Sequence, residues 1–141
     1  TDIHASIGRV QLGKLAGWTK IRQDNAAFLS QNITEAVTPT VPEGYVHVYH
    51  QYTIRVEGAT GEERDRFVTA LKEEHQVGSG VYYPIPNHRL PSLAPYAPGL
   101  ELPNTEKVAA ECVSLPVHPS LSQADLERIA EAVNKAAKAG A

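Results

Sequence analysis

The feature that most constrains the fold is a run of prolines in the second half of the chain. Six of the ten prolines fall between Pro84 and Pro103. Each proline removes a backbone N–H donor and fixes one backbone dihedral angle, so neither a regular helix nor a central strand can pass through this stretch. The sequence therefore predicts a long loop at 84–103. Inside a compact domain, a loop of that length is typical of a functional or a disordered segment.

Aromatic side chains favour the functional interpretation of this loop. The segment 81–88 (VYYPIPNH) opens the proline run, and Tyr96 lies within it. Tyrosine and histidine rings combine an apolar face with a hydrogen-bonding group, whereas disordered linkers are usually poor in aromatic residues. We predict that the segment forms one wall of a binding site.

Composition excludes several classes of protein. The formal net charge is -3 and the lysines and arginines form no cluster, so neither nucleic acid nor an anionic membrane surface is an expected partner. No apolar run approaches the roughly 18 residues of a membrane span.

Cys112 is the single cysteine, and its apolar neighbours favour a small buried hydrophobic residue over a reactive thiol. A cytoplasmic location is consistent with this pattern. The chain contains no methionine, so we expect it to be part of a longer polypeptide.

The N-terminal quarter has the pattern of a helix. Apolar residues recur every three or four positions from Ile3 to Leu29, which predicts one long helix, or two abutting helices, over 1–36. Three glycines interrupt the pattern: Gly8, Gly13 and Gly17. Each weakens a helix by up to about 1 kcal/mol relative to alanine, so we expect another element to pack closely against that face.

The remainder, 37–141, is expected to be a small αβ domain. Alternating apolar and polar residues predict a strand over 46–56. A helix that buries Phe67 and Leu71 should follow and end near Gly78, and a second strand at 80–83 would complete a strand–helix–strand unit.

Beyond the loop at 84–103 we expect a short helix at 108–112 and an extended piece at 114–116. A final helix should start at the capping-box variant formed by Ser122 and Asp125. The predicted fold class is α/β (α+β), with a long N-terminal helix and a small sheet covered by helices.

The residues that carry chemistry form no complete catalytic or metal site. His47 and His50 are three apart on the predicted strand, so their side chains should point to opposite faces and not share a metal ion. No nucleophile motif and no glycine-rich phosphate loop after a strand is present. We therefore predict no metal ligands and no catalytic residues in this chain.

Read in order, the unusual segments resemble the C-terminal part of the DegT/DnrJ/StrS family, the pyridoxal phosphate (PLP) sugar aminotransferases of fold type I. The matching segments are DIHASIG with QL at 2–12, HQY at 50–52, VYYPIPNH at 81–88, LPNTE at 102–106 and SLPVHPSLS at 114–122. They follow the family's order and spacing over nearly the whole chain. Tyr82 stands where histidine is commoner in the family, which weakens any proton or charge role there.

The resemblance implies the C-terminal portion of a nucleotide-sugar aminotransferase, which converts a keto-sugar to an amino-sugar with an amino acid donor. PLP and its reactive lysine are implied to be held mainly by a large domain outside this chain. The six lysines here lie in polar contexts that favour a solvated surface role. The chain alone is therefore expected to bind no cofactor and to be inactive. The resemblance also implies a homodimer with the active site at its interface.

The resemblance suggests which residues face the substrate. Tyr82 and Tyr83 match the family's substrate-facing pair by position, and His88 and His50 are further candidates. Structural alternatives remain open: the two tyrosines could end a strand in the core, and His50 could be a hydrogen-bonded core histidine. The whole chain could also be a non-catalytic sensor or assembly module derived from the same family.

Overall fold

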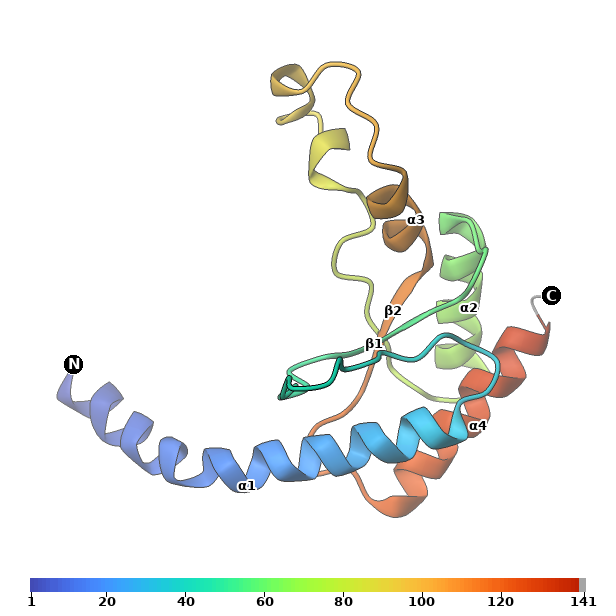
Figure 1. Ribbon diagram of the computed structural model, residues 1–141. Coiled ribbons are helices and arrows are strands. Elements are labelled where there is room, and N and C mark those ends of the chain that lie inside the picture. The colour runs from blue at the N-terminus through green and yellow to red at the C-terminus, as the bar shows by residue number, and fades with distance from the viewer. Residues whose placement is uncertain (140–141) are drawn as a thin grey trace.

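The computed structural model describes residues 1–139, a mixed α/β fold of the predicted class (Figure 1). Its elements, in order, are α1 (Asp2–Asn32), β1 (Tyr52–Arg55), α2 (Gly61–Glu73), η1 (Asn87–Arg89), η2 (Ala94–Tyr96), α3 (Pro103–Glu111), β2 (Cys112–Leu115) and α4 (Gln123–Ala139). The η elements are short 3₁₀ helices within the proline-rich loop.

Helix α1 is continuous and only partly packed. Its C-terminal part buries Ala26 and Leu29 and lies across α4, while its N-terminal half extends away from the rest of the chain (Figure 1). Ile3 and Val10 are therefore exposed. Apart from its two chain neighbours and the nearby backbone of its own helix, a Cβ atom placed at Gly8 would meet nothing within 4 Å, and the same holds for the next two glycines of the helix. Within residues 1–139, the expected close packing against these glycines is therefore not found.

The sheet is small and its order differs from the prediction. Strands β1 and β2 pair antiparallel, with Tyr52 opposite Leu115. Single bridges add Val37 beside β1 and Gly80 beside Ser114 of β2. Strand β2, which the sequence indicated only as a short extended piece, therefore lies next to β1 at the centre of the pairing.

The prediction of a strand over 46–56 is wrong for its first half, since β1 begins only at Tyr52. Tyr49 has a φ of 46°, in the left-handed region, and its backbone N–H donates to Nδ1 of His47 at 2.8 Å. A strand cannot continue through that conformation. The alternating pattern therefore ends in a turn, and Val46 is left 82% exposed.

The second predicted strand, at 80–83, is also wrong beyond its first residue. Only Gly80 forms backbone hydrogen bonds, to Ser114, with N···O distances of 2.9 and 2.8 Å. Pro84 and Pro86 follow and have no N–H to donate, so the pairing cannot extend. The predicted strand–helix–strand unit is therefore reduced to β1, α2 and one bridge, whose partner is β2.

Helix termini follow local capping signals. Thr60 and Glu63 form a capping box at the start of α2. The helix ends at Glu73, before the predicted stop near Gly78, because Gln76 takes a φ of 57° and the N–H of Val77 donates to the carbonyl of Leu71 at 2.8 Å. A residue in the left-handed conformation commonly ends a helix, so Gln76 takes the role that the sequence assigned to Gly78.

The two later helices begin at sequence-readable sites. Helix α3 starts at Pro103, earlier than the predicted 108, since proline is favoured in the first helical turn. Helix α4 begins after Ser122, whose N–H donates to Asp125 at 2.9 Å as the capping-box variant predicted.

A single hydrophobic core joins the C-terminal part of α1, both strands, α2 and α4. Its largest fully buried apolar members are Tyr52, Leu29, Ile54, Leu71, Val113 and Val133. The proline-rich loop lies outside this core. Together with α3 it extends from the end of the sheet that lies away from α1 (Figure 1). The core therefore serves as a base from which the loop projects.

Candidate functional site

A cavity of about 870 Å³ lies where the proline-rich loop meets α3 and the sheet. Its lining residues are Gln51, Thr53, Gly80, Val81, Tyr82, Tyr83, Ile85, Pro86, Asn87, His88, Leu102, Asn104, Thr105, Val108, Ala109, Cys112 and Ser114. No lysine, arginine, aspartate or glutamate is among them. The cavity thus offers apolar surface together with hydroxyl groups, amide groups and one imidazole, a combination suited to a small polar ligand with apolar faces.

Tyr82 and Tyr83 stand at the rim of this cavity and not in the core. They are 61% and 78% exposed, so the alternative of a strand end in the core is wrong. The ring of Tyr82 folds back over Gly80, where an added Cβ would lie 3.3 Å from ring atoms. Both hydroxyls remain available to a ligand, because no hydrogen bond in the described chain uses them.

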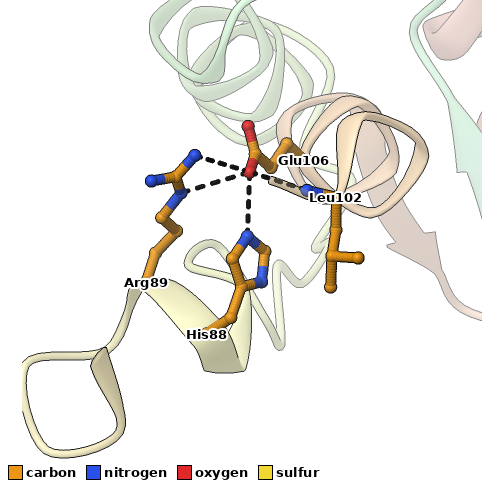
Figure 2. Close-up of polar contacts among 4 residues, drawn as sticks. All are labelled: His88, Arg89, Leu102 and Glu106. Carbon is orange, nitrogen blue, oxygen red and sulfur yellow. Dashed lines mark hydrogen bonds and ion pairs between the residues drawn. The ribbon is translucent and has the colours of Figure 1, made fainter. Parts of the chain in front are cut away.

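His88 lies in η1, and its side chain is only 6% exposed. Its Nε2 atom is 2.8 Å from Oε1 of Glu106, at the start of α3 (Figure 2). The same oxygen accepts from Nε and Nη2 of Arg89, at 3.1 and 2.8 Å, and from the backbone N–H of Leu102 at 3.3 Å. Glu106 therefore ties the start of the proline-rich loop to its end.

These donors keep Glu106 ionised. The hydrogen bond from His88 is the largest cause, followed by those from Arg89 and Leu102, and together they lower the pKa of Glu106 from 4.5 to about 2. A carboxylate accepts hydrogen bonds in its charged form, so each donor favours that form. We call this set of hydrogen bonds from His88, Arg89 and Leu102 to Glu106 the loop clamp. Because the carboxylate is ionised, the loop clamp is intact at neutral pH and well into the acid range.

His50 lies apart from the other candidates. It is exposed, so the alternative of a core histidine is wrong, and it is not among the residues that line the main cavity. It borders a neighbouring hollow of about 390 Å³, which Tyr82 also lines. The structure therefore gathers Tyr82, Tyr83 and His88 at one cavity and places His50 beside it.

Cys112 is not the core residue that its apolar neighbours suggested. It is half-buried and lies in the wall of the cavity at the start of β2. Burial raises the pKa of its thiol above the ordinary value. The thiol is therefore protonated at neutral pH and contributes a small apolar surface to the cavity.

Sequence reasoning missed the role of Glu106. The segment LPNTE at 102–106 is one of the segments that resemble the family, but nothing in the spacing connects Glu106 with His88, which is 18 residues earlier. Asn104 and Thr105, which also line the cavity, were not predicted as site residues, although they belong to the same segment 102–106. Asn87 lies in the segment 81–88, which was predicted as a wall of the site.

The residues present do not by themselves fit a PLP site. All six lysines are exposed, and the cavity has neither a lysine nor an acidic group for the pyridine nitrogen. Over residues 1–139 no group of three or more histidine, cysteine, aspartate or glutamate side chains could hold a metal ion. The same residues contain no helix that is long and apolar enough to span a membrane.

Known proteins similar to this chain include aminotransferases and a regulatory protein. A "Pleiotropic regulatory protein" of Geobacillus stearothermophilus is 36% identical over 94% of this chain and 36% of its own length. The dTDP-3-amino-3,6-dideoxy-alpha-D-galactopyranose transaminase of Aneurinibacillus thermoaerophilus is 30% identical over 95% of the chain and 36% of its own.

A solved structure agrees with these matches. Aminotransferase TlmJ from Streptoalloteichus hindustanus superposes with a TM-score of 0.83 at 28% identity, over 98% of this chain and 37% of that one. The chain thus spans little more than a third of the length of these relatives. The family model for DegT/DnrJ/EryC1/StrS aminotransferases matches residues 1–134. With the fold and nearly the whole sequence in agreement, the chain belongs to the DegT/DnrJ/EryC1/StrS aminotransferase family.

Proposed function

We propose that this chain is the C-terminal portion of a PLP-dependent nucleotide-sugar aminotransferase, which transfers an amino group from an amino acid to a keto-sugar. The observation that carries the proposal is the cavity behind Tyr82 and Tyr83 in a member of an aminotransferase family. The family relationship supports the reaction, and the cavity supports a substrate-binding role for this part of the enzyme.

The chemistry of the cavity favours contact with the sugar. Its lining has no cationic side chain, so it offers no direct partner for a diphosphate, whereas hydroxyl, amide and imidazole groups can hydrogen-bond a sugar. The rings of Tyr82 and Tyr83 supply apolar faces against which a sugar ring packs. We assign these tyrosines and His88 to the sugar, and His50 to the adjoining hollow as a more peripheral contact.

The remaining parts of the active site are assigned to the rest of the enzyme. The reactive lysine and most PLP contacts would come from a large domain, and the open cavity would be completed across a homodimer interface. The exposed apolar side chains on the N-terminal half of α1 are consistent with coverage by further protein. A cytoplasmic enzyme fits this proposal.

Removal of the Tyr83 hydroxyl tests the assignment. In the full-length enzyme, Tyr83→Phe is expected to raise KM for the keto-sugar by about 3- to 10-fold, the effect of one lost neutral hydrogen bond. Tyr96→Phe is the matched control, because Tyr96 is 86% exposed and does not line the cavity. Equal KM values for the two variants and the unmodified enzyme would contradict a substrate contact at Tyr83.

The absence of a reactive lysine is tested on this chain alone. After incubation with PLP and reduction with borohydride, mass spectrometry is expected to find no lysine modified above the level of general surface labelling. All six lysines are exposed, whereas a lysine that forms a stable imine usually lies in a desolvated pocket. Stoichiometric labelling of a single lysine would disprove this prediction.

The non-catalytic alternative keeps one observation in its favour: the similarity to a protein described as a pleiotropic regulatory protein. Under this alternative, the same cavity binds a small ligand or partner without chemistry. A lysine at the PLP position of the full-length protein, together with amino transfer to a keto-sugar, would exclude it. A full-length protein that binds sugar nucleotide but has no such lysine would establish it.

A further inference from the structure

Glu106 concentrates its contacts on one atom. Four N–H groups approach Oε1: Nε2 of His88, Nε and Nη2 of Arg89, and the backbone N–H of Leu102 (Figure 2). The donors come from both ends of the proline-rich loop. Glu106 therefore determines at once how the loop closes and how the His88 ring is oriented.

The carboxylate also determines which nitrogen of His88 carries the proton. The ionised Glu106 can only accept, so the Nε2 atom at 2.8 Å must be the donor. In the neutral imidazole the other nitrogen, Nδ1, then holds a lone pair and is an acceptor. Elsewhere in residues 1–139 no hydrogen bond engages this ring, so Nδ1 has no partner in the described chain.

The His88 ring is held by a residue that does not itself line the cavity. His88 is one of the lining residues, whereas Glu106 and Arg89 are not. The titratable groups that share the lining with His88 are Tyr82, Tyr83 and Cys112. The charged group bonded to the ring is Glu106, and Arg89 contacts that carboxylate. A neutral His88 thus offers a basic nitrogen in a cavity without lining carboxylates.

We infer that Glu106 is a positioning residue, which fixes His88 in the Nε2–H form so that Nδ1 accepts a hydrogen bond from a hydroxyl group of a sugar in the cavity. The inference rests on the proposed function for the identity of the ligand, and on the contacts of this chain alone for the state of His88. Arg89 and Leu102 hold the carboxylate in place.

The first test reads the state of His88 directly. In full-length protein labelled with ¹⁵N-histidine, the nitrogen shifts at a pH where His88 is neutral are expected to show mainly the Nε2–H tautomer. Glu106→Gln should give a mixture of tautomers, because the amide can donate to Nε2 as well as accept from it. Arg89→Ala is the control for a loosened loop, since it removes two donors from the same oxygen and should leave the tautomer unchanged.

The second test uses dTDP-glucose, which carries sugar hydroxyls but no keto group. Glu106→Gln is expected to weaken its binding by about 3- to 10-fold, the effect of losing one neutral hydrogen bond at Nδ1, and Arg89→Ala should have a clearly smaller effect. Binding of the probe should also shift the Nδ1 resonance of His88. Glu106 lies outside the core, so both variants are expected to fold. Circular dichroism verifies this before binding is measured.

The possible failures are distinguishable. A neutral His88 in the Nδ1–H form, or an equal loss of binding in both variants with an unchanged tautomer, would overturn the positioning role and leave a loop clamp only. The expected tautomer with no binding of dTDP-glucose and no shift at Nδ1 would instead contradict the proposed function and the ligand assigned to His88.

Discussion

Leu29→Ala is expected to lower the free energy of unfolding by about 2–5 kcal/mol. Leu29 is fully buried near the C-terminal end of α1, where that helix packs across α4. Truncation removes three carbon atoms from a closed core and leaves a cavity that the surrounding helices and strands can fill only in part. The loss should appear as a lower urea midpoint with an unchanged slope, measured on the 141-residue chain at a concentration where it is monomeric.

Leu12→Ala is the matched control for this prediction. Leu12 lies on the same helix and is the same residue type, but it is 70% exposed. Its truncation removes no core contact, and alanine has the higher helix propensity, so stability should change by less than about 0.5 kcal/mol. A similar loss in both variants would show that α1 is not anchored through its C-terminal part.

Glu111→Ala is expected to destabilise the chain by roughly 3 kcal/mol, at the lower end of the range for breaking a buried ion pair. The Glu111 side chain is 1% exposed, with Oε2 2.6 Å from Nη1 of Arg55 and Oε1 accepting from the backbone N–H of Gly58 at 2.9 Å. Alanine leaves both donors without their acceptor. The estimate stays at the lower end because the Arg55 side chain is 32% exposed and water can solvate it in part.

Two further variants separate charge from hydrogen bonding at this position. Glu111→Gln keeps the size of the side chain and an acceptor oxygen but loses the charge, so its effect should lie between those of the unmodified chain and Glu111→Ala. Glu57→Ala, at an exposed site close in sequence to Gly58, should be nearly neutral. If Glu111→Ala were also neutral in urea denaturation, the contact between α3 and the turn after β1 would not contribute to stability.

Local signals were sufficient for the helices and for the loop. The capping box at Thr60, the variant at Ser122 and the prolines of 84–103 each act within a few residues, so their effects can be read without knowledge of the fold. The helix ends were predicted less well. Helix α2 ends at Glu73, three residues before Gln76, which takes the left-handed conformation that glycine adopts far more readily.

Pairing between distant segments could not be predicted in the same way. The apolar alternation before Tyr52 resembles a strand, but Tyr49 turns the chain because His47 accepts its N–H. Strand β1 pairs with β2, and the side chains of Thr53 and Ser114, 61 residues apart in the sequence, are hydrogen-bonded across this pair. Neither outcome has a periodic signature, since each depends on which segments compete for the same sheet edge.

The sequence by itself determined the order of helices, the break imposed by the prolines, the family and the tyrosines that border the cavity. Only the tertiary structure decided that His88 joins this cavity while His50 stays outside it, that Cys112 is part of its wall, and that Glu106 clamps the loop. The physical reason is the distance along the chain over which each effect acts. A proline or a helix cap acts through its immediate neighbours, whereas a cavity and a carboxylate shared by four donors exist only after the core has brought separate segments together.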